Sequence, residues 1–217
     1  WRVVEGGSRE YLAPLTQRVA DSIRTRMPVS RILRPPGKPV VVQFTNGLMR
    51  EFDEVVIATH SDEALKMLGD PTDHEKAVLG AMPYRDNEVI LHTDTRLLPK
   101  TQRAWSSWNY RLKPGNGRAT VTYNMNIFQG IDAPETFCVT LNDTASINPH
   151  RILGRFNYAH PQFTLEGMQA QQRWADINGH NGTWFCGAYW QNGFHEDGLA
   201  SGLRVAESLC SARQMAA

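Results

Sequence analysis

The chain has 217 residues, of which 41% are hydrophobic and 21% are charged. These values are typical of a globular protein with one large domain or two small ones. The formal net charge of +1 lacks the basic excess of a dedicated nucleic-acid-binding protein. No run approaches the ~18 apolar residues of a membrane span, and no secretory signal is visible, so we expect a cytoplasmic protein without a transmembrane segment.

The first third of the sequence predicts a helix followed by a small antiparallel sheet. An amphipathic helix is expected over Arg9–Ile23, because apolar residues recur there every three or four positions, with Ser8 as its N-cap. Asn46 and Gly47 form a strong hairpin signal. The strands expected around it are Val29–Leu33, Val40–Thr45 and Leu48–Phe52.

A continuous apolar run follows at Asp53–His60. Such a run is typical of a strand that is buried on both faces in a parallel sheet. Two helices are then expected. The first covers Ser61–Leu68 with Ser61 as its N-cap, and the second covers Thr72–Ala81.

From residue 87 the apolar residues alternate with polar ones, which predicts antiparallel strands. The expected strands are Glu88–Thr93, Ala104–Tyr110, Ala119–Met125, Phe137–Asn142 and Leu153–Tyr158. A helix is expected over Thr164–Trp174. In this order of elements, antiparallel strands interrupt an α/β domain. The sequence therefore predicts an α/β plus α+β fold.

The last part of the chain carries the most informative pattern. A short apolar strand at Thr183–Cys186 runs into Gly187, and a loop with a second glycine leads into a helix rich in small residues at Gly198–Leu209. Glycines let the backbone come close to a bound group, and the start of a helix presents N–H donors that have no partner within the helix. This arrangement suits an anionic or electron-rich ligand.

Other site chemistries find little support in the sequence. The three cysteines are far apart, which predicts free thiols in a reducing compartment; they are Cys138, Cys186 and Cys210. Three adjacent residues, His195, Glu196 and Asp197, cannot all face one ion, so we predict no metal site. The nucleophile elbow of hydrolases is also absent from the sequence.

The strand, loop and helix at residues 183–209 resemble the C-terminal flavin-binding segment of the flavin-containing amine oxidase superfamily. The details are more similar to its bacterial predicted NAD/FAD-binding oxidoreductases than to its true amine oxidases. The resemblance implies FAD as the cofactor, bound on a partial α/β domain that an antiparallel-sheet substrate domain interrupts. It divides the chain into FAD-binding segments at 1–65 and 179–217 and a substrate domain at 66–178.

No GxGxxG motif follows a strand in this sequence. The resemblance therefore implies that the N-terminal FAD-binding segment of the same protein is missing and would be the partner of this chain. His60 stands where amine oxidases continue with a proline-rich segment, and Tyr189 stands where the family usually has an acidic residue. The first departure weakens an assignment to the amine-oxidising branch, and the second argues against a carboxylate contact with the cofactor.

The resemblance also implies which residues contact FAD. Ile23 would bind the adenine edge, and Ala58 would allow the adenosine part to approach its strand. Both positions also fit ordinary packing, Ile23 as the last apolar residue of a helix and Ala58 in a buried strand. The remaining positions lie along the pyrophosphate, ribityl chain and flavin ring; they are Gly187, Ala188, Gly193, Phe194, His195 and Glu196.

By the same resemblance Phe194 would flank the substrate. Trp105, Trp108 and Tyr110 are aromatic candidates on the antiparallel sheet, where one face would roof an apolar tunnel above the flavin; core packing is the alternative for them. We expect an FAD-dependent oxidoreductase that transfers hydride from a substrate carbon, with a lipid or acyl chain as a substrate class. No catalytic base can be named. The alternative is a binding or interaction domain without activity.

Overall fold

The computed structural model describes residues 3–112 and 119–216. The chain divides into two compact units. Unit 1 comprises Trp1–Ile23 and Asp86–His160, and unit 2 comprises Arg24–Arg85 and Pro161–Ala217. The mixed α/β character and the antiparallel sheet expected from the sequence are confirmed. The assignment of cofactor and substrate roles to residues 1–65, 66–178 and 179–217 stays a prediction.

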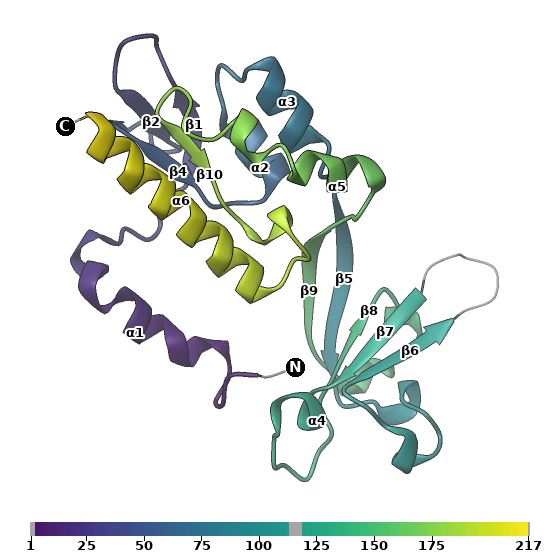
Figure 1. Cartoon of the computed structure of the whole chain (residues 1–217). Coiled ribbons are helices and arrows are strands. Elements are labelled where there is room, and N and C mark those ends of the chain that lie inside the picture. The colour runs from purple at the N-terminus through teal and green to yellow at the C-terminus, as the bar shows by residue number, and fades with distance from the viewer. Residues whose placement is uncertain (1–2, 113–118, 217) are drawn as a thin grey trace. The chain divides into compact units, whose positions relative to one another are not determined.

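Unit 2 contains two small sheets (Figure 1). Strands β1 (Val29–Leu33), β2 (Val40–Phe44) and β3 (Met49–Phe52) form an antiparallel meander. The hairpin between β2 and β3 turns at the predicted position, where Gly47 adopts a φ of 85°. Strands β4 (Val55–Ile57) and β10 (Thr183–Phe185) pair in parallel. The two segments predicted to have α/β character, one early and one late in the sequence, therefore join in one sheet.

Five main helical segments complete unit 2. They are α2 (Ser61–Met67), α3 (Asp73–Gly80), α5 (Leu165–Gln171), α6 (His195–Ala216) and the short 3-10 helix η8 (Ala188–Trp190). Another 3-10 turn, η7 (Trp174–Asp176), follows α5. Thr72 and Thr164 cap α3 and α5 through their hydroxyl groups. The expected cap of α2 is wrong, because His60 is the N-cap and the Ser61 hydroxyl donates instead to the Met82 carbonyl over 2.8 Å.

The core of unit 2 forms between the parallel strands and these helices. Ile57 and Phe185 sit opposite each other in the sheet and are buried with Leu79 and Val205. The expectation that the β4 run is buried on both faces is wrong for Val56, which is 45% exposed. The reason is that β4 is an edge strand, paired only with β10 among the described residues.

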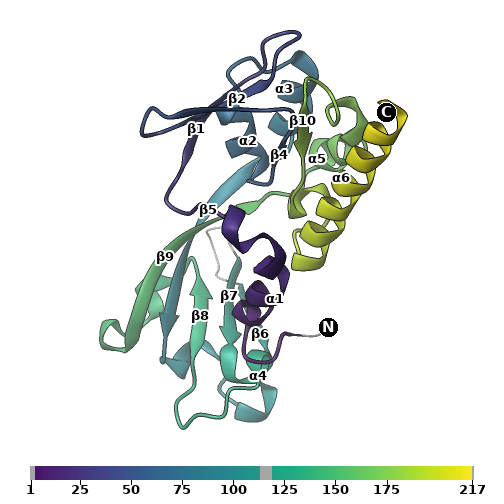
Figure 2. The ribbon, with the colours of Figure 1, turned by 90° about the vertical axis from the view of Figure 1, so that its left-hand side faces the viewer.

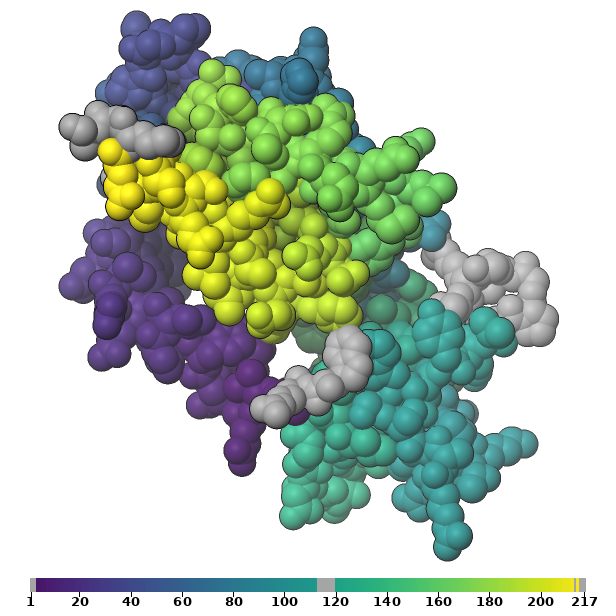
Figure 3. Space-filling view, in the orientation of Figure 1, coloured from purple at the N-terminus to yellow at the C-terminus, as the bar shows by residue number. Residues whose placement is uncertain are grey.

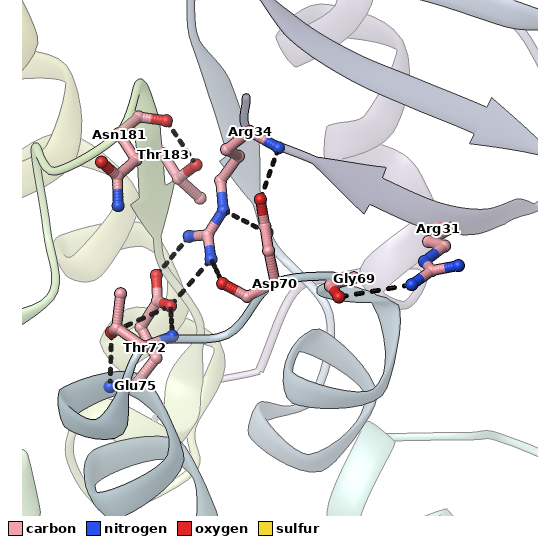
Figure 4. Close-up of polar contacts among 8 residues, drawn as sticks. All are labelled: Arg31, Arg34, Gly69, Asp70, Thr72, Glu75, Asn181 and Thr183. Carbon is pink, nitrogen blue, oxygen red and sulfur yellow. Dashed lines mark hydrogen bonds and ion pairs between the residues drawn. The ribbon is translucent and has the colours of Figure 1, made fainter. Parts of the chain in front are cut away.

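A buried ion-pair network fastens the end of β1 to the segment that enters α3 (Figure 4). The Arg34 guanidinium donates to both carboxylate oxygens of Glu75, and it also bonds Asp70. Glu75 additionally accepts the Thr72 amide over 2.7 Å, which completes a capping box at the start of α3. Burial would raise the pKa of Glu75, but the hydrogen bonds from Arg34 and Thr72 and the Arg34 charge hold it below its ordinary value.

Unit 1 is built on a five-stranded sheet with the order β6-β7-β8-β5-β9 (Figure 2). Its strands are β5 (Tyr84–His92), β6 (Trp108–Leu112), β7 (Ala119–Asn124), β8 (Cys138–Leu141) and β9 (Ile152–Pro161). All five predicted strands are therefore present. However, β6 begins at Trp108 rather than at Ala104, because Gln102–Ala104 forms a 3-10 turn, η4. A short helix, α4 (Met125–Gln129), follows β7, and the other 3-10 turns are η3 (Thr95–Leu97), η5 (Thr144–Ser146) and η6 (Pro149–Arg151).

The N-terminal helical segment of unit 1 is less regular than predicted. It consists of η1 (Ser8–Tyr11), α1 (Leu12–Thr16) and η2 (Gln17–Ser22), and Ser8 does not cap it. Its apolar side chains are exposed; they are Leu12, Leu15, Val19 and Ile23. No helix among the described residues is both long enough and apolar enough to cross a membrane.

One face of the unit 1 sheet buries a polar chain around His92. The His92 Nδ1 atom accepts the Asp94 amide over 3.1 Å, so its proton lies on Nε2, which bonds the Thr140 hydroxyl over 2.7 Å. Thr140 in turn bonds Thr122 over 2.8 Å. Burial lowers the pKa of His92, partly offset by the negative charge of Asp94. The folded protein therefore holds this imidazole neutral.

This burial predicts a pH dependence of stability. As the pH falls below 6.5, the ordinary pKa of histidine, the unfolded chain takes up a proton that folded His92 resists. The free energy of unfolding should therefore decrease down to the lower folded pKa and then level off. Urea unfolding of unit 1 between pH 8 and pH 5 measures this. The change of the free energy of unfolding with pH should be smaller in His92→Gln than in the parent protein. It should be unchanged in His150→Gln, since His150 is exposed. The same pH dependence in both variants would contradict the prediction.

Candidate functional site

The candidate site lies where the two parallel strands of unit 2 end. Ile57 pairs with Phe185, and the Cys186 amide donates to the Ile57 carbonyl over 3.1 Å. Because the strands are parallel, the segments that follow them leave from the same edge, which is where α/β sheets bind ligands. The structure therefore brings the predicted residues Ala58 and Gly187 together.

Gly187 must be glycine for a reason that the sequence did not indicate. It adopts a φ of 155° and a ψ of 161°, a backbone region that side-chain-bearing residues avoid. A Cβ atom there would lie 2.5 Å from the Tyr189 ring and 3.5 Å from the Thr59 carbonyl. The missing side chain thus makes room for Tyr189, while Ser201 accepts the Gly187 amide over 3.1 Å and ties it to α6.

The Asp197 carboxylate, in the first turn of α6, ties the preceding loop to the start of the helix. Its Oδ2 atom accepts the amides of Asn192 (3.1 Å) and Phe194 (2.9 Å). The first bond within the helix runs from the Gly198 amide to the Phe194 carbonyl. The amide of Glu196 precedes that bond and belongs to the first turn, whose N–H groups have no partner within the helix.

We expect Asp197→Ala to lower the free energy of unfolding by about 1 kcal/mol, because two amides at the helix start lose their acceptor. Chemical denaturation of the chain measures the change. Glu196→Ala is the matched control, since Glu196 is exposed in the same turn and accepts no bond from these amides. Equal losses in the two variants would show that helix-end charge, rather than capping, is responsible.

The other predicted cofactor residues lie as follows. Ala188 begins η8 and is half-buried, whereas Gly193, Phe194, His195 and Glu196 are exposed at the start of α6. Figure 3 shows α6, in yellow, at the surface of unit 2. Ile23 is exposed and belongs to unit 1, not to the unit that holds Ala58 and Gly187.

Two tyrosines lie near this edge, and sequence reasoning gave no role to the first of them, Tyr84. The Tyr84 ring stacks on His60, with ring centroids 4.1 Å apart. Burial raises the pKa of Tyr84 to about 12, with a further contribution from Asp62. Tyr189 is buried beneath the loop, where burial raises its pKa above the ordinary range. Both phenols therefore stay protonated. Tyr84 lies far from β4 in the sequence, so no local pattern connected it with this edge.

Of the predicted substrate residues, Phe194 belongs to unit 2, and Trp105, Trp108 and Tyr110 belong to unit 1. Within unit 1 only Trp108 and Tyr110 lie on the sheet. Tyr110 pairs with Val121, which pairs with Leu141, so these side chains share one face of the sheet with Trp108. Trp108 is 45% exposed and Tyr110 is 72% exposed. Trp105 instead precedes β6, and its indole N–H donates to the Pro99 carbonyl over 2.8 Å.

The same sheet face continues onto β9. A Cβ atom on Gly154 would contact the Phe156 ring and lie 4.0 Å from the Leu91 Cβ atom, so Gly154 and Phe156 lie on the Leu91 side. Leu91 pairs with Val139 on the face that carries Trp108. Strand alternation adds Tyr158, which stacks on Phe156. We call these four residues, Trp108, Tyr110, Phe156 and Tyr158, the aromatic face.

The described residues provide neither an activated buried thiol nor a cluster that could bind a metal ion. Cys138 and Cys186 are buried and Cys210 is exposed, all as free thiols. Burial raises the pKa of Cys138 to about 11 and also raises the pKa of Cys186, so neither buried thiol is a ready nucleophile. Among the described residues, no three His, Cys, Asp or Glu side chains are placed to share a metal ion.

Solved structures of two oxidases and an isomerase resemble this fold. Putrescine oxidase with bound putrescine gives a TM-score of 0.62 at 12% identity over 95% of this chain and 53% of that chain. Cyclohexylamine oxidase from Brevibacterium oxydans gives 0.56 at 13% identity over 93% and 53%. A fatty acid isomerase from P. acnes gives 0.56 at 14% identity over 83% and 47%.

At these identities the likeness establishes the fold. The chain spans about half the length of the solved structures it matches. No curated protein matches it significantly. The model of the family described as flavin containing amine oxidoreductase matches residues 2–210, nearly the whole sequence. The chain therefore belongs to the flavin-containing amine oxidoreductase family.

Proposed function

We propose that this chain is part of an FAD-dependent oxidoreductase that removes hydride from a substrate carbon. The observation that carries the proposal is the common edge where β4, β10 and the start of α6 meet. Bound FAD would supply the redox chemistry by accepting the hydride. The family match supports flavin as the group bound at this edge.

The residues at the edge fit a flavin dinucleotide. Ala58 and Ala188 have side chains small enough for close approach of the cofactor, and Ala58 is exposed. The Glu196 amide and the α6 dipole favour an electron-rich carbonyl group at the helix start. Phe194 is 43% exposed and would exclude water from one side of the ring. We assign no catalytic base in this chain.

A segment of the complete protein would finish the binding site. A groove of about 520 Å³ lies beside β4, lined mainly by apolar side chains that include Val29, Ile32 and Val56. Parallel sheets are normally covered on both faces and rarely consist of two strands. A further parallel strand from another segment of the protein, paired with the open edge of β4, would help to bury Val56 and fill this groove.

An apolar substrate, such as a lipid or acyl chain, agrees best with the aromatic face of unit 1. Its four side chains offer apolar surface without a carboxylate among them. The fatty acid isomerase among the structural neighbours supports this substrate class, whereas putrescine oxidase and cyclohexylamine oxidase are named for amines. His60 and Tyr189 also depart from the pattern of amine oxidases.

Flavin binding is tested by purifying the chain alone and together with the polypeptide encoded upstream in the same reading frame. We expect the chain alone to be colourless and the combination to be yellow, with the visible absorption bands of bound flavin. A folded combination that stays colourless with added FAD would overturn the proposal. It would favour the alternative, a binding domain without redox activity.

A substitution at the edge locates the cofactor. Ala58→Leu should weaken FAD binding to the combined protein at least about tenfold, because the larger side chain would occupy the approach to β4. Ala145→Leu is the matched control, since Ala145 is exposed in the 3-10 turn η5 of unit 1. Equal FAD affinity in the two variants would place the cofactor elsewhere.

A further inference from the structure

A stacked pair of aromatic rings lies just beyond the end of β4. The His60 ring lies on the Tyr84 ring, with centroids 4.1 Å apart and an angle of 13° between the two ring planes. Both residues belong to unit 2. The Thr59 carbonyl lies 3.5 Å from the position that a Cβ atom on Gly187 would occupy, so the segment that leads to His60 borders the candidate flavin edge.

The pair is held in place by contacts outside the stack. The Ala64 amide donates to the His60 carbonyl over 2.8 Å at the start of α2, and the Ser61 backbone bonds the Tyr84 hydroxyl. His60 is half-buried, and Tyr84 is the one ring stacked on it among the described residues. A flat ring that is already oriented loses little conformational freedom when a second flat group stacks on its other face.

The charges around the pair favour an uncharged group there. Burial raises the pKa of Tyr84, and the negative charges of Asp62 and Glu63 raise it further, so both carboxylates act at this spot. Lys66 pairs with Asp62 and leaves a net negative charge. That charge repels a phosphate. The start of α6, in contrast, attracts anionic and electron-rich groups. The adenosine part of FAD, which is flat and uncharged, therefore fits the His60 end of the site better than the pyrophosphate does.

We propose that His60, supported by Tyr84, is the stacking platform for the adenine base of FAD. The base lies on the face of the imidazole that Tyr84 does not cover, since histidine is one of the aromatic side chains on which nucleobases stack. A planar ring thus replaces the proline-rich continuation of amine oxidases at this position. The inference rests on the proposed function, because it requires FAD at this edge, and it names the residue that holds the adenosine part.

Titration of the combined protein with FAD and with FMN, which has a flavin ring but no adenosine, tests the platform. His60→Ala should weaken FAD binding about tenfold, which is the scale of one base stacked on an aromatic side chain, and should leave FMN binding unchanged. His60→Phe should retain FAD affinity, because phenylalanine also offers a flat aromatic face. His60→Leu, which is apolar without being planar, should lose as much affinity as His60→Ala.

Further variants separate stacking from general structure. His74→Ala is the matched control, since His74 is an exposed histidine in α3 of the same unit, and it should change neither affinity. Tyr84→Phe keeps the supporting ring and should bind FAD like the parent protein, whereas Tyr84→Ala removes that ring and should weaken FAD binding. Urea unfolding of each variant of the 217-residue chain checks that unit 2 remains folded.

Three results would each overturn the platform: unchanged FAD affinity in His60→Ala, equal losses of FAD and FMN affinity in that variant, or equal FAD affinities of His60→Phe and His60→Leu. The second result would put the flavin ring, rather than adenine, on His60. A folded combined protein that binds neither FAD nor FMN would overturn the flavin proposal together with the platform. A yellow protein whose His60→Ala variant keeps its FAD affinity would remove the platform alone.

Discussion

Glu75→Ala is expected to lower the free energy of unfolding of unit 2 by about 3–5 kcal/mol. The substitution leaves the Arg34 guanidinium buried with only Asp70 as a charged partner, and breaking a buried ion pair costs that much. It also removes the carboxylate that accepts the Thr72 amide at the start of α3. Urea unfolding at neutral pH, followed by tryptophan fluorescence, measures the loss.

Asp73→Ala is the matched control for Glu75→Ala. Asp73 is an acidic residue of the same helical turn whose side chain is exposed and paired with Lys76 on the surface. Exposed pairs contribute about 0–1 kcal/mol, so this variant should stay close to the parent protein. If Glu75→Ala were no more destabilising than Asp73→Ala, the network in Figure 4 would not be important for stability.

Gly187→Ala should lower the free energy of unfolding by about 2–4 kcal/mol and disorder the candidate flavin edge. A methyl group at this position requires a backbone conformation that alanine avoids, and it overlaps the Tyr189 ring. The loop that carries Ala188 must then move away from β4. Denaturant unfolding measures the stability, and FAD binding by the combined protein should fall together with it.

A double substitution separates the two causes of this loss. Tyr189→Ala removes the ring that the methyl group would meet, so Gly187→Ala should cost less in that background, and the remainder reports backbone strain. Gly80→Ala is the control, because Gly80 lies in α3 and a Cβ atom there meets only Leu65 at 3.8 Å. A full cost of Gly187→Ala in the absence of Tyr189 would exclude the overlap.

Local patterns in the sequence were sufficient to predict most elements. Alternation of apolar residues located the antiparallel strands of unit 1, and the apolar run before Ala58 located β4. Asn46 and Gly47 placed the hairpin between β2 and β3. Such signals depend on residues a few positions apart, so no knowledge of the fold is required to read them.

Element boundaries and caps were predicted less well. The strand β6 begins four residues later than expected, which removes Trp105 from the sheet. Ser61 has the right residue type for an N-cap, yet its hydroxyl bonds the Met82 carbonyl. The Asp197 carboxylate accepts the amides of Asn192 and Phe194, a contact that was not predicted. For Ser61 the deciding neighbour, Met82, is far away in the sequence and comes close only in the folded chain.

The sequence by itself determined the type of most elements, the family resemblance and the short list of residues around Ala58 and Gly187. Only the tertiary structure decided that β4 and β10 pair in parallel, that Arg34 bonds Glu75, and that the buried His92 ring bonds Thr140. Helical and strand patterns repeat within a few residues, whereas these contacts join residues far apart in the chain. Their geometry depends on packing and on hydrogen-bond direction, which exist only once the chain has folded.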